Sequence, residues 1–99
     1  MIYRMRTYRG VKEHLATFTS FFTEHLLPVQ LRHGARLVGR WQTEDDRIVA
    51  VWEYDSRDAF NRIQSAVAQD PASTRARSLR KSLPRLYDSM EEVFMESTV

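Results

Sequence analysis

The chain has 99 residues, the length of one domain, of which 42% are hydrophobic and 28% charged. The absence of cysteine excludes disulfides, thiolate catalysis and cysteine–zinc sites, and a net charge of +2 is too small to argue by itself for a nucleic-acid partner. No apolar run is long enough to cross a bilayer, and Arg4, Arg6 and Arg9 interrupt any signal-peptide core. We therefore expect one domain over residues 1–99, cytoplasmic and without membrane contact.

The first eight residues, MIYRMRTY, alternate as a β-strand does. We expect one face of this strand to pack under helices: Tyr3, Met5 and Thr7. The opposite face carries two guanidiniums and a phenol, a set that suits a pocket wall: Ile2, Arg4, Arg6 and Tyr8.

Apolar residues from Val11 to Val29 recur at spacings of three and four, which predicts an amphipathic helix. Pro28 should stop or kink this helix, or begin a short continuation that Gly34 ends. The next two segments, Arg36–Thr43 and Arg47–Tyr54, are predicted strands joined by a polar turn at residues 44–46.

In the first of these strands, alternation places Leu37 and Trp41 on one face and Arg40 on the other. The strand Arg47–Tyr54 is apolar on both faces, which indicates that both are covered.

Two helices and a last strand complete the chain. Asp55 is the predicted N-cap of the first helix, and Asp70 followed by Pro71 begins a shorter one that ends by Pro84. Loose alternation over residues 85–96 predicts the final strand.

The order of elements predicts an α+β, ferredoxin-like βαββαβ fold with a four-stranded antiparallel sheet. Two helices cover one face, and we expect the uncovered face to carry Tyr8, Trp52 and Tyr54, with Trp41 beside them. Burying a large aromatic side chain is worth roughly 2–3 kcal/mol. The sequence therefore predicts a homodimer packed sheet to sheet, with Arg4 and Arg6 lining a cavity. The alternative is a monomer with scattered aromatics.

Several segments resemble the NIPSNAP family of the dimeric α/β-barrel superfamily: residues 1–8, LLPVQLRHG (Leu26–Gly34), LVGRW (Leu37–Trp41), VWEYDSRDAF (Val51–Phe60) and Asp70–Ala72. The chain departs from the family pattern at Arg4, usually acidic, and at Ser73, often Trp. The resemblance implies a ferredoxin-like protomer in a barrel-forming dimer. The wider superfamily includes cofactor-free monooxygenases, haem-handling enzymes and lactone isomerases.

Arg6 and Tyr8 are the candidate catalytic residues, because a guanidinium beside a phenol can stabilise an enolate or carboxylate. The candidate ligand-binding residues supply a further cation and a set of aromatic walls: Arg4, Trp41, Trp52 and Tyr54. Two alternatives stay open. The arginines can instead pair with carboxylates on a neighbouring strand, and the aromatics can instead form a dimer core.

His25 is a candidate general base, against the alternative of a solvated surface histidine. We expect no metal, because no carboxylate lies at ligand spacing from the histidines, and no cofactor; haem binding would require His25 to face the pocket. The basic run Arg75–Arg85 is either an anion-binding rim, a nucleic-acid contact or a solvated face, and we favour the last.

From these residues we expect a homodimer that binds a small, largely apolar, anionic molecule in a barrel pocket. A cofactor-free monooxygenase or isomerase would use Arg6 and Tyr8 for the anion. The alternative is a non-catalytic ligand-sensing or assembly module.

Overall fold

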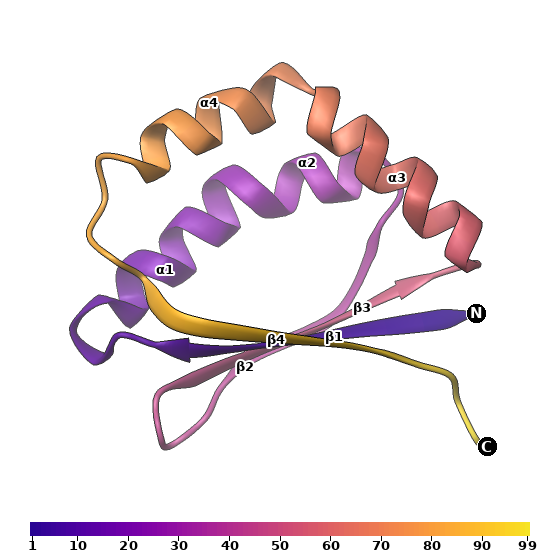
Figure 1. Ribbon diagram of the computed structural model, residues 1–99, viewed down its shortest axis with the longest axis horizontal. Helices are drawn as coiled ribbons and strands as arrows, with labels where there is room; N and C mark the ends of the chain where they lie inside the picture. The colour runs from indigo at the N-terminus through magenta and orange to yellow at the C-terminus, as the bar shows by residue number, and fades with distance from the viewer.

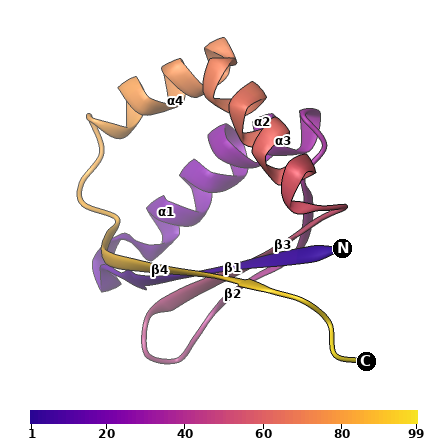
Figure 2. The ribbon, with the colours of Figure 1, turned by 45° about the vertical axis from the view of Figure 1, so that its right-hand side comes forward.

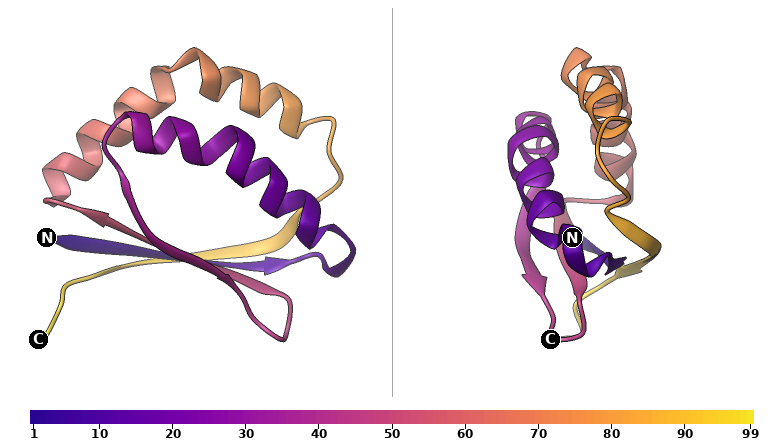
Figure 3. Two further views of the ribbon diagram at one scale, coloured as in Figure 1. Left: turned by 180° about the vertical axis from the view of Figure 1, so that it is seen from behind. Right: turned by 90° about the vertical axis from the view of Figure 1, so that its left-hand side faces the viewer.

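A computed structural model describes residues 1–99. It consists of a four-stranded antiparallel sheet with all the helices packed on one face, so the other face is bare (Figures 1 and 3). The fold is the predicted ferredoxin-like α+β arrangement. No helix is both long enough and apolar enough to span a lipid bilayer.

The sheet has the strand order β2-β3-β1-β4. The strands are β1 (Ile2–Gly10), β2 (Arg36–Gln42), β3 (Arg47–Tyr54) and β4 (Tyr87–Met95). In the central pair, Arg4 lies opposite Trp52 and Tyr8 opposite Ile48. On the other side of β1, Arg6 lies opposite Glu92. This register gathers the long polar side chains of β1 among the aromatics of β3 and the carboxylate of β4.

The first helical segment is continuous but not uniform. After a 3₁₀ turn, η1 (Lys12–His14), it runs through α1 (Leu15–Phe21), a π-helical stretch, η2 (Phe22–Leu26), and α2 (Leu27–Arg32). The N–H of Leu27 donates to the Phe22 carbonyl, five residues back. Pro28 explains the widening, because its ring conflicts with an ordinary α-turn before it. Gly34 has a φ of 103°, a left-handed conformation that follows the end of α2.

The second helical segment joins α3 (Arg57–Gln69) to α4 (Pro71–Arg80) and lies beside the first, as the right-hand view of Figure 3 shows. The N-cap of α3 is Ser56, whose hydroxyl accepts a hydrogen bond from the Ala59 N–H, so the prediction of Asp55 was wrong. Asp70 caps α4 as predicted, accepting from the Ala72 N–H. Its side chain also binds the end of α2, which joins the two helical segments.

The predicted assignment of faces was wrong. The helices cover the face that carries Tyr8, Trp52 and Tyr54, and the last two side chains are 3% and 0% exposed. Met5 and Thr7, which alternate with the covered residues, therefore lie on the bare face. β3 decides the outcome, because its residues Ile48, Ala50, Trp52 and Tyr54 form a larger apolar surface than Val49 and Val51 do.

A bulge in β2 between Leu37 and Gly39 changes the alternation of that strand. Leu37 pairs with Trp52 and Arg40 with Ala50, so both belong to the covered face, whereas Trp41 lies on the bare face. The prediction that Leu37 and Trp41 share a face was therefore wrong. Trp41 is 52% exposed and its indole lies over Gly39, where any Cβ atom would collide with it.

Figure 2 shows the bare face below the strands, turned away from both helical segments. Apolar side chains on this face come from all four strands: Met5, Trp41, Val49, Val51 and Val93. Val93 is 46% exposed, so the apolar surface continues to the β4 edge.

Candidate functional site

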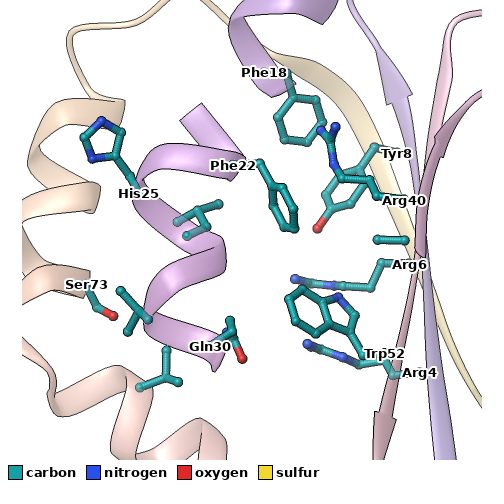
Figure 4. A pocket seen from close by; sticks show the side chains of 14 residues that line it. Arg4, Arg6, Tyr8, Phe18, Phe22, His25, Gln30, Arg40, Trp52 and Ser73 are labelled. Atoms are coloured by element: carbon teal, nitrogen blue, oxygen red, sulfur yellow. The ribbon is translucent and has the colours of Figure 1, made fainter. Parts of the chain in front are cut away.

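A cavity of about 180 Å³ lies between the covered face of the sheet and the helices (Figure 4). Its lining combines three arginines with aromatic and aliphatic side chains and contains no carboxylate: Arg4, Arg6, Tyr8, Phe18, Phe22, His25, Leu26, Val29, Gln30, Arg40, Ala50, Trp52, Val67 and Ser73. For scale, an engineered cavity of about 150 Å³ holds one benzene molecule. The site can therefore take about one substituted ring.

Arg4 is a largely saturated cation at the base of the cavity. Its Nη1 donates to Glu92 at 3.1 Å and its Nη2 to the Tyr54 hydroxyl at 2.9 Å. The guanidinium also lies 5.1 Å from the centroid of Phe60. Only Nε, which is buried, lacks a partner. Arg4 is thus mainly a structural residue. It pairs with a carboxylate on a neighbouring strand, which was the alternative to a ligand-binding role.

Arg6 shares the same carboxylate less closely. Its Nε lies 3.4 Å from Glu92 without forming a hydrogen bond, and no other acid contacts it. The guanidinium lies 5.7 Å from the centre of the Tyr8 ring. One carboxylate therefore serves two guanidiniums, and Arg6 retains unused donors toward the cavity.

Arg40 is a third cation, which the sequence interpretation did not select. Its Nη1 donates to Thr19 Oγ1 at 2.8 Å, and its guanidinium lies 4.6 Å from the centroid of Phe22 and 5.0 Å from that of Phe18. It has no acidic partner, and Nη2 is buried without any hydrogen bond. Burial lowers the pKa of Arg40, but a guanidinium stays charged in proteins.

Tyr8 supplies the neutral donor of the site. Its ring packs edge-on against Phe18, with centroids 5.1 Å apart, and against Tyr87 at 4.8 Å. In Figure 4 its hydroxyl is directed toward the region between Arg6 and Arg40. Burial raises the pKa of Tyr8, against the opposing effect of Arg6. The phenol therefore stays protonated at neutral pH and can donate a hydrogen bond.

The three aromatics selected from the sequence have different positions. Trp52 lines the cavity, where its indole packs against Phe22. Tyr54 is fully buried beneath Arg4, accepts a hydrogen bond from it, and does not reach the cavity. Trp41 lies on the bare face and is also absent from the lining. The structure therefore brings Trp52, but neither Tyr54 nor Trp41, to the cavity.

His25 lies apart from the arginines. It comes from η2 and borders the cavity, but in Figure 4 its ring points toward α4, on the far side of the helix from Arg6 and Tyr8. Its side chain is 40% exposed, and Nε2 lies 3.7 Å from a carboxylate oxygen of Glu24. The structure does not bring the candidate base together with the candidate anion site.

The basic run divides among several environments. Arg75 is exposed and Arg85 forms an ion pair with Asp88, whereas Arg77 and Arg80 border a second cavity of about 230 Å³ beneath α4. The guanidinium of Arg80 lies 5.1 Å from the Tyr87 ring. The run does not form one continuous basic stripe.

Taken together, Arg6, Arg40 and Tyr8 place guanidinium and phenol donors on one side of an otherwise apolar cavity. Such donors can bind an anion or stabilise negative charge as it develops on a substrate oxygen. No side chain that could accept a proton lies close to these donors, because the lining contains no carboxylate and His25 points away. The arrangement favours anion binding over proton abstraction.

The fold and cavity define a ferredoxin-like α+β protein with a cation-lined pocket between sheet and helices. The NIPSNAP family model matches residues 3–98, so the chain belongs to the NIPSNAP family. Among curated proteins, none matches the sequence.

Solved structures agree on the fold. A NIPSNAP domain protein from Burkholderia xenovorans is 23% identical, with a TM-score of 0.85 over 99% of this chain and 95% of that one. A NIPSNAP family protein of unknown function from Agrobacterium tumefaciens is 22% identical, with a TM-score of 0.81 over 96% and 86%. An antibiotic biosynthesis monooxygenase is more distant, 13% identical with a TM-score of 0.67 over the full length of both chains. At these identities the likeness is one of fold.

Proposed function

We propose that this protein binds a small, largely apolar anion in the cavity between its sheet and helices. The supporting observation is Arg40, a cation with a buried, unpartnered Nη2 and no acidic neighbour, at the same cavity as Arg6 and Tyr8. Leaving a buried donor without a partner costs about 1–3 kcal/mol, and more for a charged group. An anion that accepts from Arg40 would recover this free energy.

The charges at the site favour an anion, because its three guanidiniums share one carboxylate, Glu92. Glu92 is shared by Arg4 and Arg6, which leaves Arg40 without compensation and Arg6 only partly compensated. The planar fork of a guanidinium matches a carboxylate, and the aromatic lining accommodates an apolar body.

Benzoate and its uncharged isostere benzamide test this proposal. Titration calorimetry should show that the protein binds benzoate at least about tenfold more tightly than benzamide, because hydrogen bonds to charged groups contribute roughly 1.5–3 kcal/mol. Arg40→Met retains length without charge and should abolish the preference. Arg75→Met, an exposed arginine on α4, is the matched control. Equal affinity for both compounds, or no effect of Arg40→Met, would contradict the proposal.

Enolate-type catalysis is the second candidate, supported by the convergence of Arg6, Arg40 and Tyr8 as oxyanion donors. A cofactor-free monooxygenase would need a substrate whose own enolate or phenolate supplies electrons to O₂, and an isomerase would need an acidic C–H bond. Oxygen uptake on a panel of acidic phenols, lost in Arg6→Met, would support the oxygenase. Binding without turnover would instead favour the non-catalytic sensing or assembly module.

We also propose that the protein is a homodimer that pairs through its bare sheet face. Each of the four strands contributes at least one apolar side chain to this face, and large exposed apolar patches usually mark interaction surfaces. Eight residues along four strands give roughly 500 Å² of flat area before side-chain relief. Side-chain relief makes the accessible surface larger than this flat area, and a standard interface buries ~800 Å² of accessible surface on each partner.

A further inference from the structure

The second cavity adjoins the first. Its lining is largely apolar near the first helical segment and includes Phe21 and Ala76, with Arg77 and Arg80 at its border. Leu26, Val67 and Ser73 border both cavities, and they come from η2, α3 and α4 respectively. The two cavities are therefore neighbours across a partition that three different elements form.

Ser73 is the small, polar member of that partition. Figure 4 shows it on α4 with its side chain directed toward the first helical segment. It is half-buried, and its side chain is the smallest of the three that border both cavities. Ser73 is therefore the shared position at which a larger side chain would most obstruct the way from one cavity to the other.

The donors are distributed unequally between the two cavities. The first holds Arg40 with its buried, unpartnered Nη2, together with Arg6 and Tyr8. The second has arginines only at its border, where Arg77 is exposed to water. A buried unpartnered donor gains more from an anion than a solvated one does, because water already satisfies the solvated group. The charged end of a ligand therefore belongs in the first cavity.

We propose that the ligand is a monocarboxylate with an unbranched apolar tail, its carboxylate on Arg6 and Arg40 and its tail passing Ser73 into the second cavity. This proposal rests on the anion-binding function proposed above and extends it to the ligand class. The first cavity alone holds about one ring, whereas the adjoining second cavity of about 230 Å³ more than doubles the available space. A tail that passes among Leu26, Val67 and Ser73 fits best as a straight chain, because branches and fused rings are wider.

Straight-chain carboxylates from butyrate to octanoate test the tail site in the full-length protein by titration calorimetry. Each methylene that leaves water should tighten binding by about fourfold, the equivalent of ~0.8 kcal/mol. Ser73→Trp should fill the partition, retain butyrate binding and abolish the gain with chain length. Ser78→Trp places the same bulk on the exposed side of α4 and is the matched control. Ser73→Leu serves as a second variant if the tryptophan impairs folding.

The outcomes separate this proposal from the one on which it rests. If benzoate and butyrate bind but octanoate binds no more tightly, the tail site is wrong and anion binding stands. If the gain with length persists in Ser73→Trp and Ser73→Leu, the tail lies elsewhere and the proposal is also wrong. If no carboxylate binds, the anion site itself is wrong.

Discussion

The guanidinium of Arg40 lies 4.6 Å from the ring centroid of Phe22, and this contact joins the edge strand β2 to the π-helical stretch η2. The aromatic face stabilises the cation without neutralising it. Thr19 takes one donor of Arg40, and no carboxylate takes the others. Arg40 is therefore held in place by neutral partners and keeps its charge for a ligand.

Tyr8→Phe should weaken benzoate binding by about tenfold or more, because a hydrogen bond to a charged group contributes roughly 1.5–3 kcal/mol. The ring packing against Phe18 and Tyr87 is retained, so the free energy of unfolding should change little. Calorimetric titration and urea unfolding measure the two quantities. A variant with unchanged benzoate affinity would show that the hydroxyl does not contact the anion.

Glu92→Gln should have the opposite effect on binding. Glu92 competes with any ligand for Arg4 and Arg6, so removing its charge should tighten benzoate binding while affecting benzamide little. The same change should lower the free energy of unfolding by about 1–3 kcal/mol, because Arg4 is buried and loses its charged acceptor. Glu91→Gln, on the adjacent position of β4 and the other face of the sheet, is the control. Unchanged benzoate affinity in Glu92→Gln would place the anion away from these arginines.

The strands and the order of the helices and strands along the chain were predictable, because alternation and helix capping are local sequence signals. β3 has the predicted bounds, Arg47–Tyr54, and the Asp70–Pro71 signal correctly located the start of α4. The covered face was not predictable from β1 alone, because Met5 looks more apolar than Arg4 does. The strand register shows why Arg4 can face the helices. Arg4 lies opposite Trp52, and a long arginine side chain can pack its stem among aromatic residues. Glu92 compensates the charge of the guanidinium.

Arg40 was missed for a related reason. Its position in β2 alternates correctly with Trp41, but only the pairing of Arg40 with Ala50 shows that it faces the same helices as Arg6. Because β2 has a bulge at Val38, alternation counted along the whole strand does not predict which residues share a face. Arg6 and Tyr8 could be selected together because they are neighbours on one strand, whereas Arg40 joins them only through the sheet.

Asp70→Asn should remove part of the acid sensitivity of the fold. The Arg32 guanidinium, then the Ala72 N–H and His33, hold the pKa of Asp70 well below its usual range. A depressed carboxyl pKa adds stability that is fully present above the unfolded value of about 3.9 and is lost as pH falls toward the folded value. The variant keeps the helix cap but loses the ion pair with Arg32, 2.7 Å away.

Thermal unfolding followed by circular dichroism at pH 7, 5 and 3 measures this effect. The variant should be less stable than the unchanged protein at pH 7 and pH 5, and the difference should narrow at pH 3. Asp58→Asn, at an exposed site of α3 without an ion pair, should show no such pH-dependent difference. A difference that stays constant down to pH 3 would assign the effect of Asp70 to capping alone.

The bare sheet face provides the last prediction. Val93→Glu and Trp41→Glu should each convert the proposed homodimer into a monomer. A two-fold interface would bury the new carboxylate of each protomer without a cationic partner, and near the axis the two carboxylates would also repel each other. Both sites are about half exposed in the single chain, 46% and 52%, so the protomer should remain folded. Leu31→Glu, at a residue of α2 that is 49% exposed, is the matched control and should leave the dimer intact. Native mass spectrometry and sedimentation measure the mass directly, and a protein that is already monomeric at micromolar concentration would contradict the proposed pairing. A dimer lost only in Leu31→Glu would instead place the interface on the helices.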